Sequence, residues 1–342
     1  MIKPNEEANS RAQVFETLME NPGAIVSSSL LTQRLSSSRQ AVFKAVCSLK
    51  DEGVPIESIP QKGYRLESID ELQKLSPTMI EFFLRDNPLF NRCIYMRETD
   101  STQKVIKKLA MQEAEAGIVA LTERQSEGRG RRGRSWQSPD EKNLMFSMLL
   151  RPTLKPGEVQ LLNLAAGLAV KETLGELCGI PSELKWPNDI LCRGKKLCGI
   201  LSEAAGEPDR IYYAVTGIGI NVNMGPPDIP EEIAGVATSV LIEGGRRFAR
   251  WKLLVDFLAR FAALMELLSS RGGAVKLLSL YRRGCDTIGR EIRVVQDEEI
   301  FNGRATGITP EGALVVHTRD GEKIFAAADV HHLRMAEGVN GG

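Results

Sequence analysis

The sequence predicts an α+β protein built from several domains. Its 342 residues exceed the roughly 100–200 that one domain usually holds. The hydrophobic pattern changes twice along the chain: helical spacing dominates residues 10–52, apolar runs alternate with helices from 92, and short β patterns fill 286–335. We therefore expect a helical domain at 1–70, a mixed α/β domain at 71–285 and a small all-β domain at 286–342.

Composition narrows the class of protein. Apolar residues make up 42% and charged residues 26%, as in ordinary globular chains, which excludes a mostly disordered or fibrous protein. Lys plus Arg and Asp plus Glu both number 44, so any site for a polyanion must be a local basic patch. The start lacks a signal peptide's apolar stretch, and no run of about 18 apolar residues predicts a membrane-spanning helix.

Cysteine and histidine usage points to a reducing compartment and away from a metal centre. The six cysteines form no Cys-x-x-Cys pair, which favours reduced, buried thiols and a cytoplasmic location. The three histidines, His317, His331 and His332, all fall in the last 26 residues. A His-rich metal centre or a Ser-His-Asp triad in the body of the chain is therefore disfavoured, and we predict no metal-ligand set.

The N-terminal elements follow the order helix, helix, helix, hairpin. The third helix has N-cap serines at 36–38 and an apolar stripe of Val42, Phe43, Val46 and Leu49. Ile56–Ile59 and Tyr64–Leu66 flank a turn at 60–63. This order predicts a winged helix-turn-helix domain.

A polar linker helix with its loop is expected at 68–91. Beyond it, apolar runs at 94–96, 118–122, 144–150, 190–191, 197–201 and 211–222 predict strands. Long apolar helices are expected at 158–178 and 249–268. The β patterns after 286 predict a small β cap.

Residues 128–134, Gly-Arg-Gly-Arg-Arg-Gly-Arg, form the densest charge cluster. From 122 to 134 there are five Arg against two Glu, and three closely spaced glycines let the backbone approach a ligand. Guanidinium groups and free backbone N–H groups together make an anion cradle. The string also satisfies G-x-G-x-x-G, but no crossover helix is predicted after it, so we reject a dinucleotide fold. A solvated basic loop or a nucleic-acid patch stays open as an alternative.

A second cluster lies at Lys185-Trp186-Pro187-Asn188-Asp189, followed by a hairpin with a basic tip at 193–196. Lys196 stands at the base of this hairpin, where it could neutralise developing negative charge. The alternative is a turn at 188–189 and a solvated lysine. Residues 217–221 alternate Gly and Ile before Asn221, which would let a flat ligand lie against the strand.

Taken together, these motifs resemble the family of bifunctional biotin–protein ligases that also repress the biotin operon. The resemblance rests on Glu98-Thr-Asp-Ser-Thr-Gln103, Gln125-x-x-GRGRRGR-x-Trp136, KWPND at 185–189, Lys196-Leu-Cys-Gly-Ile-Leu201 and Gly217-Ile-Gly-Ile-Asn221. It covers essentially the whole chain. It implies a central domain like those of class II aminoacyl-tRNA synthetases and a C-terminal SH3-like β-barrel.

The resemblance also implies the reaction. Biotin and ATP, with Mg²⁺, would give biotinyl-5′-adenylate and pyrophosphate, and a lysine on a biotin carboxyl carrier domain would then take the biotin and release AMP. The implied catalytic residues are Lys196, Arg131 and Asp189. Biotin would be bound by Ser101, Thr102, Gln125, Arg129, Arg131 and Lys196, and the nucleotide by Gly128, Arg129, Gly130, Arg132, Trp136, Asn188 and Asn221.

The chain departs from the family pattern at a few places. Gln103 replaces the usual Asn, and Cys192 and Cys198 replace apolar or small residues. The segment expected to cover the adenine, around 225–240, matches weakly and yields no residue assignments.

Residues 30–66 carry six basic against three acidic side chains, a local excess in a neutral chain. Expected DNA-binding residues are Ser37, Ser38, Arg39, Gln40, Lys44, Lys62 and Arg65, at the start of the third helix and in the hairpin. The functional hypothesis is that the protein forms a homodimer on operator DNA when adenylate is bound. The alternative is that this domain is a retained scaffold that no longer binds DNA. Two other functions stay open: a DNA-binding effector sensor without ligase activity, and a lipoate–protein ligase.

Overall fold

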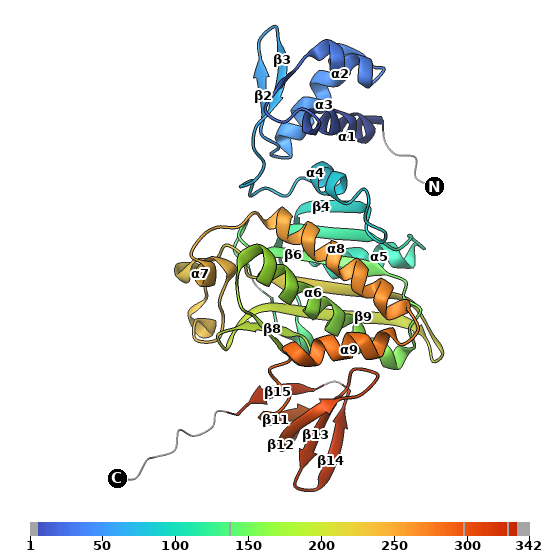
Figure 1. Cartoon of the computed structure of the whole chain (residues 1–342), viewed down its shortest axis with the longest axis vertical. Helices are drawn as coiled ribbons and strands as arrows, with labels where there is room; N and C mark the ends of the chain where they lie inside the picture. Colours follow the sequence, from blue (N-terminus) through green and yellow to red (C-terminus); the bar gives the residue numbers. More distant parts are fainter. Residues whose placement is uncertain (1–5, 137, 297, 327, 334–342) are drawn as a thin grey trace.

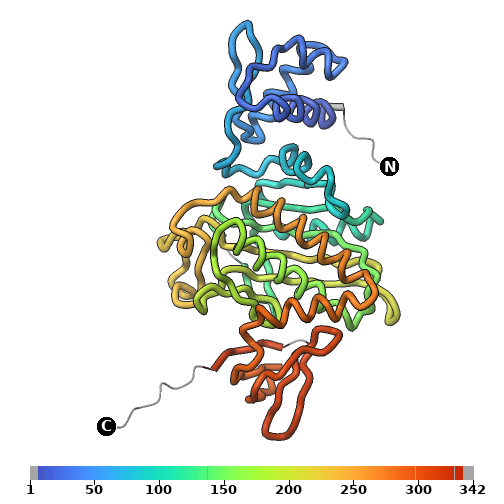
Figure 2. Tube along the Cα trace, in the orientation of Figure 1, coloured from blue at the N-terminus to red at the C-terminus, as the bar shows by residue number. Residues whose placement is uncertain are grey.

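The computed structural model describes residues 6–136, 138–296, 298–326 and 328–333. Three parts follow one another along the long axis of the molecule, with the N-terminal domain at one end and the C-terminal domain at the other (Figures 1 and 2). The central part is the largest and carries the main sheet.

The N-terminal part contains the predicted helices and hairpin. They are α1 (Glu6–Met19), α2 (Ser28–Arg34), α3 (Arg39–Asp51), β2 (Ile56–Ile59) and β3 (Gly63–Leu66), and a short strand β1 (Ile25–Val26) pairs with β3. Ser38 caps α3, since its side chain accepts from the backbone N–H of Ala41. This arrangement confirms the predicted helix-turn-helix with a β wing.

One residue of the predicted apolar stripe was assigned to the wrong face. Val42, Val46 and Leu49 are buried, as the helical spacing requires. Phe43, in contrast, is 59% exposed. It is adjacent in sequence to the core position Val42, which places it about 100° around the helix and outside the stripe.

The central sheet has seven strands in the order β4-β5-β6-β10-β9-β8-β7. Only β4 and β5 run parallel; every other neighbouring pair is antiparallel. The strands are β4 (Arg92–Thr99), β5 (Ile118–Gln125), β6 (Leu144–Leu150), β7 (Glu183–Lys185), β8 (Asp189–Cys192), β9 (Lys195–Glu207) and β10 (Arg210–Ile220).

Helices cover both faces of this sheet. Alternate residues of β5 join different apolar clusters: Val119 and Leu121 pack with α6 (Gln160–Cys178) and α8 (Arg250–Ser269), whereas Ile118 and Ala120 pack with α5 (Thr102–Met111). The shorter helices are α4 (Pro77–Phe83), α7 (Val240–Gly244) and α9 (Gly273–Gly284). The sequence analysis predicted α6 and α8 but not α5, α9 or β7.

The C-terminal part is an antiparallel five-stranded sheet in the order β14-β13-β12-β11-β15. Its strands are β11 (Glu291–Gln296), β12 (Glu299–Ile308), β13 (Leu314–Thr318), β14 (Gly321–Phe325) and β15 (Asp329–His332). Buried Trp186 joins it to the central domain, because its indole N–H donates to Gly312 O at 2.9 Å and its backbone N–H to Thr287 Oγ1 at 3.0 Å.

The segment after the wing is anchored to the start of α8. Arg250 donates from Nη2 to Gln73 O at 2.8 Å, Trp251 Nε1 donates to Ile69 O at 3.3 Å, and Lys252 pairs with Asp70 at 2.6 Å. Arg250 is fully buried and also pairs with buried Glu123 of β5. The linker is thus part of the packed structure of the central domain.

Candidate active site and DNA-binding surface

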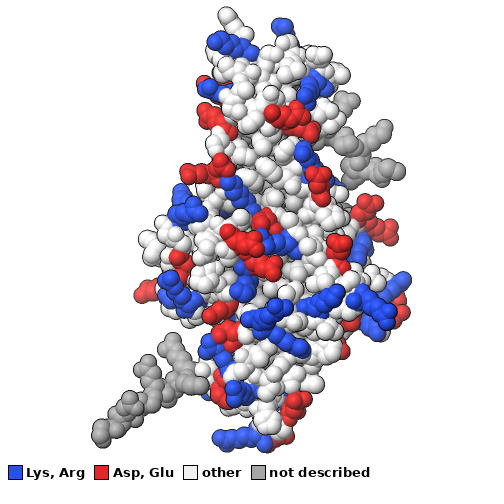
Figure 3. Space-filling view, in the orientation of Figure 1, with Lys and Arg blue, Asp and Glu red and all other residues white. Residues whose placement is uncertain are grey.

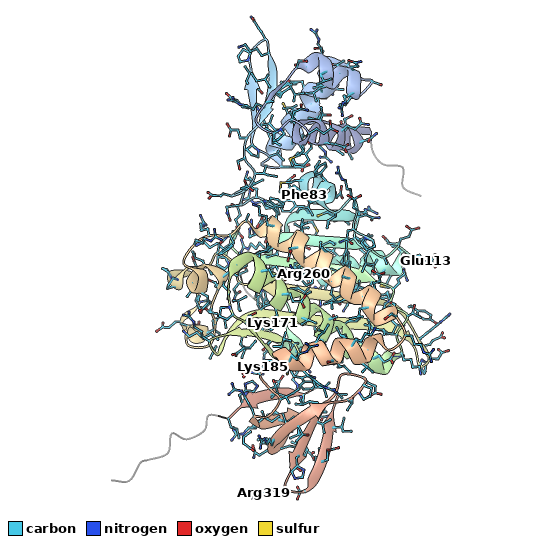
Figure 4. All side chains as sticks on the ribbon, viewed as in Figure 1. Phe83, Glu113, Lys171, Lys185, Arg260 and Arg319 are labelled. Carbon is cyan, nitrogen blue, oxygen red and sulfur yellow. The ribbon has the colours of Figure 1, made fainter. Side chains whose placement is uncertain are left out.

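A cavity of about 450 Å³ opens where the central sheet, the loop of residues 128–134 (the Gly-Arg loop) and the C-terminal domain meet. Its walls come from β5, β8, β9 and β10, from the loop at 129–136, from residues 230–237 and from β15. Lys185, one of the lining residues, lies near the boundary between the central and C-terminal domains (Figure 4). The cavity therefore draws on segments spread over more than half of the chain.

One end of the cavity is a network of uncharged hydrogen-bonding groups. Gln125 Oε1 accepts from Thr102 N at 2.9 Å, and the Thr102 hydroxyl lies 2.7 Å from that of Ser147. Ser101 is buried beside them at the start of α5, and its hydroxyl does not cap the helix. Such donors and acceptors suit a neutral polar ring system. Ser147 was not among the predicted residues.

The Gly-Ile strand and its partner leave room for aromatic groups. Gly219 of β10 lies directly opposite Gly199 of β9. The indole of Trp136 fills the space over this pair: a Cβ on Gly219 would approach the ring to 2.4 Å. Gln103 fills the corresponding space over Gly217 and donates to Leu201 O at 2.7 Å. Trp136 Nε1 is buried and has no partner among the described residues.

A charged group occupies the centre of the cavity. Lys196 Nζ lies 2.7 Å from Asp189 Oδ1 and 5.8 Å from the Trp136 ring centroid. Lys185 is the backbone register partner of Asp189 across β7 and β8, and burial lowers the pKa of its ammonium group. Burial also lowers the pKa of the Arg131 guanidinium. Five Lys and Arg side chains line the cavity against three Asp and Glu, which leaves an excess of positive charge for an anionic ligand.

The Gly-Arg loop is tight and rests on the C-terminal domain. Gly130 N donates to Arg134 O at 2.7 Å, and Trp136 N to Gly128 O at 2.8 Å. Arg131 Nη1 donates to Ala328 O at 3.1 Å, while Arg134 pairs with Asp329 at 2.7 Å. The loop is therefore held by backbone and side-chain contacts to β15 and its preceding residue.

The structure brings most, but not all, of the expected ligand-binding residues to the cavity. Lining residues among them are Ser101, Thr102, Gln125, Arg129, Gly130, Arg131, Trp136, Asn188, Asp189, Lys196 and Asn221. Arg132 does not line it, because its guanidinium donates to Val295 O at 3.0 Å. Gly128 does not line it either: it packs under Trp136 O, which a Cβ would approach to 2.4 Å.

Two amides in the wall are already hydrogen-bonded within the protein. Asn188 Nδ2 donates to Ile200 O at 2.8 Å, and Asn221 Nδ2 to Thr238 O at 3.0 Å. Asn221 Oδ1 lies 3.3 Å from Asn143 Nδ2. Asn221 thus fixes the end of the segment 225–240 as well as lining the cavity.

Several lining residues were not among the site residues predicted from the sequence. They include Lys185, Ser147, Arg134, Met224, Pro230, Glu232, Ile233, Val236, Ala237, Asp329 and His331. Residues 230–237 reach the cavity because Lys196 N donates to Val236 O at 2.7 Å and Thr238 N to Lys196 O at 2.9 Å. This long-range pairing leaves no local pattern in the sequence. Lys185, by contrast, stands in the KWPND motif and could have been included.

The DNA-binding surface predicted on the N-terminal domain is only partly available. Arg39, Gln40 and Lys44 on α3 and Lys62 in the wing turn are exposed, and Ser37 is half-buried. The Ser38 hydroxyl is occupied in capping. Arg65 pairs with Glu57 of the neighbouring strand, which neutralises its charge.

Charge elsewhere is mixed, and the space-filling view shows basic and acidic side chains interspersed over the visible face (Figure 3).

Among the described residues, no three His, Cys, Asp or Glu side chains are grouped so as to hold a metal ion. None of the helices in the described ranges is long and apolar enough to cross a membrane.

Known proteins match this chain in all three parts. Residues 95–221 match the biotin/lipoate A/B protein ligase family, residues 287–333 the biotin protein ligase C-terminal domain, and residues 10–65 an HTH domain. The bifunctional ligase/repressor BirA of Bacillus subtilis is 35% identical over 94% of this chain and 98% of its own length. BirA of Escherichia coli is 32% identical over 92% and 95%.

A solved structure agrees with these matches. The biotin protein ligase of Aquifex aeolicus, in complex with biotin and ATP, superposes with a TM-score of 0.61 at 30% identity, covering 71% of this chain and all of that one. The chain therefore belongs to the biotin–protein ligase family, and its N-terminal HTH domain places it among the bifunctional ligase/repressors.

Proposed function

We propose that this chain joins biotin to a carrier protein by way of biotinyl-5′-adenylate. The observation that carries the proposal is the Lys196–Asp189 pair, which lies between the uncharged Ser101–Thr102–Gln125 network and the basic Gly-Arg loop. A cavity that is neutral at one end and cationic at its centre fits a biotin ring at one end and a carboxylate with phosphates at the centre.

In the first step, a biotin carboxylate oxygen attacks the α-phosphorus of ATP, and the bond to pyrophosphate breaks. Two anions must approach, so cations in the cavity lower the barrier. Lys196 would hold both the carboxylate and an α-phosphate oxygen, and Arg131 and Arg129 would add positive charge. The buried indole N–H of Trp136 and the amides of Asn188 and Asn221 would contact the nucleotide.

In the second step, a carrier lysine amine attacks the acyl carbon and AMP leaves. The amine must lose a proton during this attack. Asp189 is the carboxylate that contacts Lys196, and it would accept this proton or keep Lys196 oriented. No covalent bond to the protein is required.

Magnesium would arrive with the nucleotide. Among the described residues no three carboxylate, His or Cys side chains are grouped as an all-protein metal site, so the nucleotide would hold most of the ion's coordination sphere. Those ligands would be triphosphate oxygens, as is usual for Mg²⁺ with nucleotides. No step above depends on the ion.

The segment 225–240 would cover the adenine. Ile233 and Val236 line the cavity and are 42% and 61% exposed. Packing of these side chains against a base would remove their apolar surface from water and so stabilise the bound nucleotide. The role of this segment rests on its position, since the sequence motif is weak.

The N-terminal domain supports a second activity, biotin-dependent repression. We propose that adenylate-loaded protein forms a homodimer on a two-part operator, with Arg39, Gln40, Lys44 and Lys62 at the DNA. Arg65, because it pairs with Glu57, would contribute less. We also propose that the central domain is related to class II aminoacyl-tRNA synthetases, that the C-terminal domain is an SH3-like barrel, and that the protein is cytoplasmic.

The ligase proposal is tested by exchange of labelled pyrophosphate into ATP. Biotin should support exchange and lipoate should not. Lys196→Ala should lower the rate by about 10²–10³-fold, the usual cost of losing one group aimed at developing charge. Lys195→Ala is the matched control, because Lys195 is the exposed neighbour on the same strand and should change little. Exchange with lipoate would indicate the related ligase, and absence of exchange with either acid would leave a DNA-binding sensor.

A further inference from the structure

The recognition helix α3 carries an aromatic side chain on its solvent face. Phe43 is 59% exposed, whereas the neighbouring core positions Val42 and Val46 are buried. Phe43 lies four residues after Arg39 and three after Gln40, so all three share one face of the helix. Lys44 follows directly and is also exposed.

Unpaired positive charge in this domain lies on α3 and in the wing turn. Three arginines of the domain are matched by acids: Arg11 with Glu52 at 3.3 Å, Arg34 with Glu20 at 2.7 Å, and Arg65 with Glu57. Lys50 donates to Ser58 at 2.8 Å. Within the described part of the chain, Arg39, Lys44 and Lys62 form no ion pair within 4 Å, which leaves their charge for an external anion.

An exposed phenyl ring amid unpaired cations suits the major groove of DNA. There the cations meet phosphates and the ring meets base edges. Phenylalanine has no hydrogen-bonding group, so it can recognise only an apolar feature. Thymine alone among the four bases presents one in this groove, its 5-methyl group.

The start of α3 sets which residues can reach the bases. Ser38 is the N-cap, and its hydroxyl accepts from Ala41 N, so it fixes the helix end. In helix-turn-helix proteins the N-terminal residues of the recognition helix contact base edges. Arg39, Gln40 and Phe43 are the exposed residues of its first turn and a half.

We propose that Phe43 determines operator specificity by packing on the methyl group of a thymine in each half-site. The inference rests on the proposed repressor function and adds to it a base-reading residue of stated chemistry. Phe43 supplies apolar contact, while Arg39 and Lys44 supply the sequence-independent attraction to phosphates.

The test begins with selection of binding sites from random duplexes by adenylate-loaded, full-length protein. Each thymine of the selected site is then replaced by deoxyuridine, which removes only the methyl group. One position per half-site should weaken binding about four-fold, as expected for one buried methyl group. Phe43→Ala removes the contact in both half-sites of the dimer, so it should weaken binding to the thymine duplex about 16-fold and bind both duplexes equally.

Two control variants separate base recognition from electrostatic attraction to phosphates and from nonspecific apolar effects. Lys44→Ala removes one lysine from each protomer, so it should weaken binding to both duplexes by the same factor and reduce the salt slope by about two, while discrimination between the duplexes is kept. Ile324→Ala removes another exposed apolar side chain, 61% exposed in the C-terminal domain, and should leave DNA binding unchanged. Since Phe43 is outside the core, its alanine variant should keep the wild-type unfolding temperature.

The outcomes are distinct. The inference is overturned if no thymine responds to demethylation, or if Phe43→Ala still discriminates. A change in self-association of Phe43→Ala with unchanged discrimination would assign the ring to a protein contact and also overturn it. Failure to select any sequence would overturn the repressor function itself, and the inference with it.

Discussion

The buried pair of Arg250 and Glu123 allows a quantitative prediction about stability. Arg250 is fully buried, and its guanidinium makes five contacts: to both oxygens of Glu123, to Asn143 O at 2.9 Å and twice to Gln73 O at 2.8 and 3.2 Å. Arg250→Met keeps much of the apolar volume but removes every donor. The change would leave the buried Glu123 carboxylate without its cation, with the Tyr95 hydroxyl at 3.4 Å still donating to it.

The expected cost follows from these contacts. Removal of one partner of a buried ion pair costs about 3–5 kcal/mol, because the remaining charge stays desolvated. The two backbone carbonyls that lose their donor add to this cost. We expect a loss of about 4 kcal/mol or more from the free energy of unfolding, a large part of the 5–15 kcal/mol typical of a domain.

The double variant Glu123→Leu, Arg250→Met is the matched control. With both charges gone, the desolvation penalty disappears, so we expect it to recover about 2 kcal/mol relative to Arg250→Met. Urea denaturation followed by tryptophan fluorescence measures both, since Trp136, Trp186 and Trp251 are the chain's three tryptophans and all lie in the central domain. A single variant within 1 kcal/mol of wild type, or a double variant no more stable than the single one, would refute the reasoning.

Three further predictions concern the cavity and the C-terminal domain. If Asp189 accepts the amine proton, Asp189→Asn should slow transfer to the carrier more than it slows pyrophosphate exchange. Single-turnover transfer from preformed adenylate measures this difference. Equal effects on the two steps would indicate that Asp189 only orients Lys196. Gly219→Ala should displace the Trp136 indole, 2.4 Å from the new Cβ, and raise the KM for ATP in the exchange assay with a smaller effect on kcat. Burial and the nearby Lys185 lower the pKa of His332 to about 4 from its ordinary 6.5. Because the unfolded chain then binds the proton more readily, the stabilisation from neutral His332 is complete above pH 6.5 and is lost as the pH falls toward 4. His332→Asn should flatten this loss in calorimetric scans, and an unchanged slope would contradict it.

Local patterns predicted most of the fold. The spacing of apolar residues located α6, α8 and the central strands, and the serine caps with the hairpin located the N-terminal domain. The error at Phe43 arose because a residue adjacent to a core position was counted in the stripe, although it lies about 100° around the helix. Helix α5 has helical spacing at Val105, Ile106 and Leu109 and could have been predicted.

The cavity was predicted where motifs are compact and missed where it depends on distant pairing. Lys196 and Asp189 lie on neighbouring strands but not opposite each other: Asp189 pairs with Gly199, and the Lys196 side chain lies over that glycine to meet the carboxylate. The family motifs, rather than hairpin spacing, marked both residues. Residues 230–237 reach the site only through backbone bonds to Lys196, and His331 only because the C-terminal sheet docks on Trp186. Arg132 could not be distinguished from Arg131 by residue type, since the loop conformation alone turns one inward and the other toward Val295.

The anchoring of the linker has a consequence for dissecting the chain into fragments. A fragment starting at residue 71, where we predicted the central domain to begin, would lack Ile69 O and Asp70 and so deprive Trp251 and Lys252 of their partners. One starting after Gln73 would also expose the guanidinium of Arg250 on the Gln73 side. A fragment starting at residue 67 keeps all of these contacts but loses Glu52, whose carboxylate accepts from Ser76 and Thr78 at the start of α4, and Phe15, whose ring packs on Phe82. The connecting segment therefore packs against both neighbouring domains, and a cut at the wing removes contacts that hold the start of α4.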